Sequence, residues 1–136
     1  MANALPVNYK NLLLGNGNNA LPDMDTDSHR ATLVDHGVAT PDPATHDDLA
    51  DYVAGVIAES GNLASASIAS GAIDFADFTF STVTGASCES LCFHLETGTD
   101  GTSTFWLFID TATGLPVTPN GGDINVVLNA SGLFTF

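Results

Sequence analysis

The chain has 136 residues, of which 44% are hydrophobic and only 13% are charged. Its 16 acidic residues stand against two basic ones, Lys10 and Arg30, so the formal net charge is −14 at pH 7. Proteins that bind nucleic acids or anionic membranes need clustered lysine and arginine side chains. The composition therefore predicts a globular protein that binds neither partner, with one folded domain for a chain of this length.

Residues 1–28 are predicted to form an extended N-terminal arm and an acidic loop, followed by a single β-rich domain over residues 29–136. No basic region precedes a long apolar run at the start, so we expect no signal peptide and synthesis in the cytoplasm. No stretch approaches the ~18 apolar residues of a membrane span. The apolar run Leu12, Leu13 and Leu14 makes the arm a candidate for contact with a neighbouring subunit, on which it would become ordered.

Alternating aspartates in the acidic loop resemble the beginning of a calcium-binding loop. Asp23, Asp25 and Asp27 offer the hard oxygen ligands that Ca²⁺ prefers. An EF-hand loop would need glycine at its sixth position and glutamate at its twelfth, where this chain has Ser28 and Val34. The EF-hand interpretation therefore fails. A solvated acidic loop is the default, and a looser calcium site is the alternative.

An amphipathic helix is predicted over residues 46–59. Thr45 is a suitable N-cap, acidic residues follow it at the positive end of the helix dipole, and Gly61 stands where a C-terminal cap would lie. Apolar residues recur at the spacing of a single helix face, namely Leu49, Tyr52, Val53, Val56 and Ile57.

Most of the remaining sequence predicts short strands. In "SLCFHLE" the alternation places Leu91, Phe93 and Leu95 on one face and Cys92, His94 and Glu96 on the other. Several such runs, separated by turn residues, are typical of an antiparallel β-sandwich or a barrel-like domain. The expected fold class is therefore mainly β, with one helix and an N-terminal arm.

The run "TFWLFID" is apolar on both faces of a strand. Phe105, Leu107 and Ile109 are expected to oppose Trp106 and Phe108. Such a strand lies either at the centre of a sandwich or beneath another subunit. Phe105, Trp106 and Phe108 are therefore interface candidates.

No catalytic arrangement is recognisable, and we expect neither enzyme activity nor a cofactor. A nucleophile, base and acid in a known pattern are missing. Cys88 and Cys92 would lie roughly 13 Å apart in a strand, too far for a disulfide, so two buried free thiols are expected. The histidines form no close ligand pair, so no zinc site is predicted; they are His29, His36, His46 and His94.

The stretch "DTATGLPVTPNGGDINV", residues 110–126, raises the question of a glycine-rich ligand loop. It lacks the spacing and the lysine of a phosphate-binding loop and precedes a strand, so no helix N-terminus is available there. Asn120-Gly121 suits the positive φ positions of a tight turn, and two prolines stiffen the connection. The stretch therefore predicts a braced hairpin between two apolar strands.

Four stretches resemble small structural proteins of tailed-bacteriophage virions: "MANALP", "LVDH", "ESGNLASASIASGAIDFADFTFSTVTG" and above all "FIDTATGLPVTPNGGDINV". Members of this group are acidic chains of similar length with the same elements in the same order. The similarity covers nearly the whole chain.

The resemblance implies a non-enzymatic capsid decoration (cement) protein on the surface of the virion, where it stabilises the phage head. Its partners would be the major capsid protein and further copies of itself, with a trimer favoured. The family pattern contains no catalytic residues. The alternative is a head–tail connector, or a tail- or fibre-associated β-sandwich that binds a receptor or glycan, with or without calcium.

Overall fold

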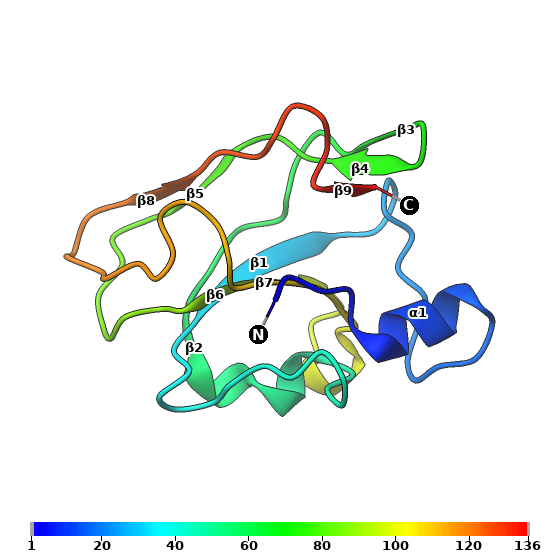
Figure 1. The fold of residues 1–136 in the computed structure, drawn as a ribbon, viewed down its shortest axis with the longest axis horizontal. Coiled ribbons are helices and arrows are strands. Elements are labelled where there is room, and N and C mark those ends of the chain that lie inside the picture. The colour runs from blue at the N-terminus through cyan, green and yellow to red at the C-terminus, as the bar shows by residue number, and fades with distance from the viewer. Residues whose placement is uncertain (1, 136) are drawn as a thin grey trace.

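The computed structural model describes residues 2–135, which form two antiparallel β layers and one α-helix (Figure 1). The first layer is a four-stranded sheet with the strand order β2-β1-β6-β7. Its strands are β1 (His29–Val34), β2 (Val56–Glu59), β6 (Ser90–Leu95) and β7 (Phe105–Ile109). The prediction of a mainly β protein with antiparallel sheets is therefore confirmed.

The second layer consists of two small sheets, with the orders β3-β4-β9 and β5-β8. It lies along one side of the four-stranded sheet, while α1 and several short 3-10 turns lie on the other (Figure 1). The strands of this layer are β3 (Ser67–Ala69), β4 (Ala72–Asp74), β5 (Phe78–Phe80), β8 (Ile124–Val126) and β9 (Phe134–Thr135). The helical elements are α1 (Val7–Leu13), η1 (Leu49–Asp51), η2 (Val53–Gly55) and η3 (Asp100–Thr102).

Hydrophobic side chains cover both faces of the four-stranded sheet. Leu33 and Phe93 belong to a large cluster that also contains side chains of the second layer. Their chain neighbours Val34 and Cys92 belong to a second cluster. Because successive side chains of a strand point to opposite faces, the two clusters lie on opposite sides of the sheet. This double burial explains why β6 is buried along its whole length.

A β-bulge at Trp106 changes the faces of β7. His94 pairs with Phe105 and Phe93 pairs with Leu107, so Trp106 is an extra residue opposite β6. Trp106 and Leu107 both enter the large cluster. Phe105 and Phe108 both enter the second. The predicted strict alternation along this strand is therefore wrong.

The two-sided apolar strand is buried within a single chain. Phe105, Trp106 and Phe108 each have 0% exposure. The two hydrophobic clusters of the chain itself account for both faces of β7. These three interface candidates therefore offer no surface to a partner, although β7 lies at the edge of its sheet and not at its centre.

The predicted helix over residues 46–59 is wrong. The chain there forms two 3-10 turns and then β2, which pairs with β1. Asp48, and not Thr45, caps the first turn by accepting a hydrogen bond from the amide of Ala50. The helical spacing did identify buried residues, since Leu49 and Tyr52 enter the second cluster. Pairing with the edge of β1 satisfies the backbone of the last four residues in place of helical hydrogen bonds.

The extended N-terminal arm is also corrected by the structure. Ala4 pairs with Phe108 through two backbone hydrogen bonds of 3.0 Å. Helix α1 then buries Tyr9 and Leu12. Asn8 holds the following loop, because its Oδ1 accepts a 2.7 Å hydrogen bond from the amide of Asn18. This segment thus packs against its own chain without needing a neighbour.

The stretch 110–126 does not form the predicted hairpin. It starts after β7 in the four-stranded sheet and ends in β8, which pairs with β5 in the other layer. On the way Val117 and Cys88 exchange backbone hydrogen bonds of 2.8 and 3.0 Å. Gly121, with φ of +88°, donates its amide to the carbonyl of Val83 at 2.8 Å. The stretch is a crossover between layers that bends at Gly121 and Gly122, and of the pair Asn120-Gly121 it is Gly121 that has the predicted positive φ.

Gly55 stands at the junction between the second 3-10 turn and β2. A Cβ added at this position would lie 2.8 Å from the carbonyl oxygens of Asp35 and Ala39. If position 55 lay inside a helix, alanine would instead be more stable there than glycine by about 1 kcal/mol. The change in stability caused by Gly55→Ala should therefore be a loss in the observed turn and a gain in the helix that the sequence predicts.

We expect Gly55→Ala to lower the free energy of unfolding by about 1–3 kcal/mol, because backbone atoms cannot move away from the new methyl group without strain. Gly101→Ala is the matched control, since a Cβ there meets nothing within 4 Å. Urea denaturation of both variants measures the difference. A more stable Gly55→Ala protein would contradict the turn.

A buried hydrogen-bonded pair connects β1 to β7. Trp106 Nε1 donates to His29 Nδ1 at 3.1 Å, and His29 Nε2 lies 3.1 Å from the carbonyl oxygen of Asp23. Both imidazole nitrogens are therefore used by a neutral ring. Burial lowers the pKa of His29 below its ordinary value of 6.5, although the carbonyl of Asp23 and nearby carboxylates raise it.

We expect stability to fall as the pH falls below about 6.5, because the unfolded chain then binds a proton that His29 in the folded chain resists. His29→Gln keeps an acceptor for Trp106 and a donor for Asp23 but removes the titration. Urea midpoints measured from about pH 7.5 to about pH 5 should decrease more for the wild type than for the variant. Equal decreases would show that His29 is not responsible.

Candidate functional site

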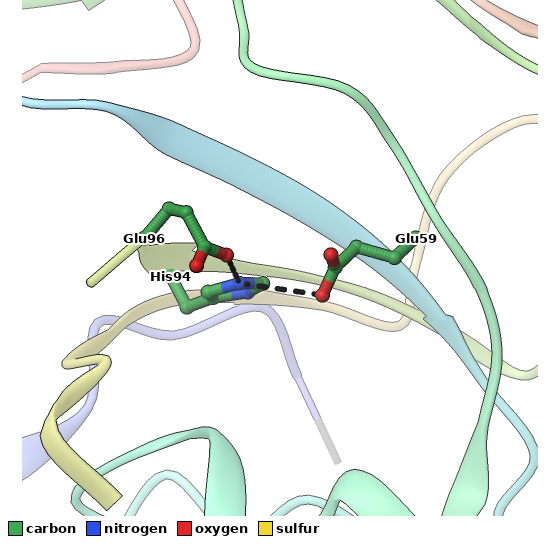
Figure 2. Close-up of side chains that lie close together, drawn as sticks. All are labelled: Glu59, His94 and Glu96. Carbon is green, nitrogen blue, oxygen red and sulfur yellow. Dashed lines mark ion pairs between the residues drawn. The ribbon is translucent and has the colours of Figure 1, made fainter. Parts of the chain in front are cut away.

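A cluster of charged side chains lies across three neighbouring strands of the four-stranded sheet. Arg30 is on β1, and it pairs in register with His94 on β6. Glu59 ends β2, and Glu96 follows directly after β6. The antiparallel pairing brings these residues together from three separate parts of the chain. Figure 2 shows the imidazole of His94 between the carboxylates of Glu59 and Glu96.

The imidazole of His94 is fully buried beside the two carboxylates. Its Nε2 lies 3.6 Å from Glu59 Oε2 and 3.5 Å from Glu96 Oε2. These separations exceed the 2.7–3.2 Å typical of a protein hydrogen bond by about 0.3 Å or more. Among the described residues, neither Nδ1 nor Nε2 has a hydrogen-bond partner.

Burial lowers the pKa of His94, and the charge of Arg30 lowers it further. The carboxylates of Glu59 and Glu96 act in the opposite direction. Because desolvation is the largest of these effects, the ring is neutral at neutral pH. A neutral imidazole keeps one nitrogen with a free lone pair, which is the form that binds metal ions.

Each carboxylate is held through the oxygen that does not face the histidine. Arg30 NH1 donates to Glu59 Oε1 at 2.7 Å. The amide of Gly98 donates to Glu96 Oε1, also at 2.7 Å. Arg30 is itself oriented by a 2.9 Å bond from its Nε to Asn62 Oδ1. The two Oε2 atoms lie on the side of His94, and Glu96 Oε2 is also 3.5 Å from Arg30 NH1.

Glu59, His94 and Glu96 are ligands that a metal ion could use. One donor atom from each lies within 4.8 Å of the other two, and this is the group that satisfies that criterion in the described part of the chain. The alternation of β6 does place His94 and Glu96 on one face. No sequence pattern pointed to Glu59 as a ligand, because it falls in the stretch predicted to be helical.

The three aspartates of the acidic loop do not converge in this way. They are exposed, and their contacts are local: the amide of Asp23 donates to Asp27 Oδ2 at 2.9 Å. Asp23 and Asp25 share a hydrogen bond that lowers the pKa of Asp23 and raises that of Asp25. The loop therefore has the geometry of an acidic turn.

The apolar residues of the N-terminal segment divide between core and surface. Leu12 is 9% exposed and packs inside, whereas Leu13 is 42% and Leu14 is 85% exposed. Of the interface candidates, only Leu13 and Leu14 offer apolar surface.

The prediction of two buried free thiols is confirmed for Cys88 and Cys92. Burial raises the pKa of Cys88 to about 11 and raises that of Cys92 as well, which makes both thiols poor nucleophiles.

A cavity of about 590 Å³ lies beside the crossover segment. Leu33, Leu91 and Ile109 from the four-stranded sheet form part of its wall. The rest comes from Asn3, Val117, residues 111–115 and 124–129, and the chain just before β9. The lining combines aliphatic side chains with asparagine and threonine. The predicted ligand loop therefore borders a hollow, although it carries no charged group that faces into it among the lining residues.

A scan of the sequence against protein-family models finds no match, and a search of curated proteins finds no similar sequence. None of the helices in residues 2–135 has the length and apolar character needed to cross a membrane.

We expect Arg30→Gln to lower the free energy of unfolding by about 1 kcal/mol, since Glu59 and Glu96 then face each other without the guanidinium between them. The loss should shrink in about 1 M salt, where exposed charges are screened. Lys10→Gln removes the other basic side chain, which is exposed on α1, and serves as the control. Urea denaturation at low and high salt measures both effects. Equal losses in the two variants would show that net charge, and not the cluster, is responsible.

Proposed function

We propose that the protein is a non-enzymatic structural component of a bacteriophage virion, a decoration protein that binds the major capsid protein and stabilises the head. The observation that carries this proposal is the motif "FIDTATGLPVTPNGGDINV", which resembles the corresponding motif of small virion proteins. Its position supports an architectural role, because the segment joins the two β layers and is fixed at Val117 and Gly121.

The surface of the N-terminal segment also supports the proposal. Val7, Leu13 and Leu14 of this segment are among the exposed large hydrophobic residues, and Leu21 follows in the next loop. Exposed large apolar side chains that are close together in the chain are candidates for a protein–protein interface. Lys10, one of only two basic residues, is exposed on the same helix. The segment therefore combines apolar contact with a cation that an acidic capsid surface would attract.

Self-association belongs to the same proposal, with a trimer favoured. Strand β3 is at the edge of its sheet and is exposed throughout, with Ile68 at 54% exposure. An exposed edge strand carries unpaired backbone groups that another chain can use. A copy paired at β3 would cover both the edge and Ile68.

The cavity beside the crossover favours a second candidate, a tail- or fibre-associated protein that binds a receptor or glycan. Its volume of about 590 Å³ lies in the usual range for small-molecule sites. Its threonine and asparagine side chains offer hydrogen bonds. A thermal shift on addition of glycans would support this candidate.

The decoration role is tested by binding the purified protein to capsids that lack it. We expect Leu14→Asp to weaken binding more than about tenfold, because a carboxylate replaces an exposed apolar contact. Val127→Asp is the control, since Val127 is 78% exposed but follows β8 in the other layer. Co-sedimentation measures binding, and thermal denaturation shows that both variants are folded.

Decorated capsids should also release their DNA at a higher temperature than bare capsids. Absence of binding by the wild-type protein, or equal capsid stability with and without it, would overturn the decoration role. Equal binding by the two variants would remove α1 as the contact surface.

A further inference from the structure

The donor atoms of the charged cluster face a common point. Three donor atoms point toward one another (Figure 2): His94 Nε2 from β6, Glu59 Oε2 from β2, and Glu96 Oε2 from the residue directly after β6. Imidazole nitrogen and carboxylate oxygen are the ligands that zinc and neighbouring transition metals use in proteins. Calcium and magnesium prefer oxygen ligands alone, so the histidine favours the transition metals.

The spacing of these atoms suits ligands of one metal ion better than a hydrogen bond. Two ligands at the usual zinc distances and a tetrahedral angle lie about 3.4 Å apart. The observed separations from Nε2 are 3.6 Å to Glu59 Oε2 and 3.5 Å to Glu96 Oε2. The three donor atoms all lie within 4.8 Å of one another, so an ion would coordinate all three residues once the two carboxylates close around it.

The buried imidazole gives independent support. His94 has no exposed side-chain surface, and neither of its nitrogens has a hydrogen-bond partner within residues 2–135. A polar group buried in this state costs free energy, about 1–3 kcal/mol for a neutral group. An ion at Nε2 would satisfy that atom and leave Nδ1 unpartnered. Nε2, which has no hydrogen bond, thus faces the same point as the two carboxylates.

The outer contacts fix the ligands before any ion arrives. Arg30 holds Glu59 Oε1 and the amide of Gly98 holds Glu96 Oε1, so both Oε2 atoms lie toward His94. Arg30 NH1 is also 3.5 Å from Glu96 Oε2, which keeps that oxygen beside the guanidinium. Outer partners of this kind orient the ligands of known metal sites. The charges also agree: two carboxylates and one guanidinium leave a local charge of −1, which a divalent cation compensates.

We infer that Glu59, His94 and Glu96 bind a divalent transition-metal ion, with zinc the best match to the ligand set. The ion would link β2 to β6 across β1 and so fasten three strands of the sheet. Three protein ligands leave the fourth position of a tetrahedral ion to water. This site does not depend on the virion role and would exist in the isolated protein.

The test is titration of the chelator-treated full-length chain with zinc chloride, followed by calorimetry and thermal denaturation. We expect one zinc ion per chain at the strongest site, and a melting temperature that rises with zinc concentration. Glu96→Gln keeps an acceptor for Gly98 but loses the ligand oxygen, so zinc affinity should fall more than about tenfold. Glu59→Gln should have the same effect.

Glu89→Gln is the matched control, because it removes the same charge from the remaining glutamate of the chain outside the cluster. It should bind zinc as the wild type does. Both cluster variants replace partly exposed side chains, so they are expected to fold without metal; zinc-free melting checks this. Failure of the wild type to bind zinc would overturn the inference. Equal zinc affinities of Glu96→Gln and the wild type would also overturn the inference, because acidic residues outside the cluster would then be responsible for zinc binding.

Discussion

Burial of the four-stranded sheet on both faces is the constraint on which the rest of the structure depends. Strands β1 and β6 have almost no exposed residues, so each polar group on them needs a partner inside the chain. Most have one: His29 bonds to Trp106, and Thr32 donates to the carbonyl of Cys92 at 3.4 Å. His94 is the exception, and it lies where two carboxylates converge. Among the described residues, the candidate site and the Tyr52 hydroxyl are thus the places where the packing leaves a buried side-chain polar atom without a hydrogen bond.

Residues from most of the chain are needed to cover both faces of the four-stranded sheet. The second layer covers one side, and on the other side the segment of the 3-10 turns supplies Leu49 and Tyr52. The bulge at Trp106 lets β7 give aromatic side chains to both clusters. Because this burial is completed within the chain, partners must use what remains outside, such as Leu14 and the edge at β3.

The sequence was informative where local pattern and final structure agree. Alternation along residues 90–96 correctly predicted a strand with His94 and Glu96 on one face, but it did not predict that both faces of this strand are buried. The helical pattern around Leu49 and Tyr52 predicted their burial but not their backbone, because pairing with β1 outweighed helix propensity. A bulge adds one residue through the geometry of the partner strand, so nothing in "TFWLFID" reveals it. Glu59 joins His94 only through the strand order, which a local pattern does not contain.

The strand order has a consequence for how the chain folds. Strand β1 has β6 as its neighbour, and Thr32 and Cys92, which bond across that pair, are 60 residues apart. Ala4 likewise cannot form its backbone bridge until Phe108 has been synthesised. A nascent chain therefore exposes β1 on the ribosome until most of the sequence has been made. Contacts of such long sequence separation make folding slow, on the order of milliseconds to seconds, and leave that strand in need of protection from other chains in the meantime.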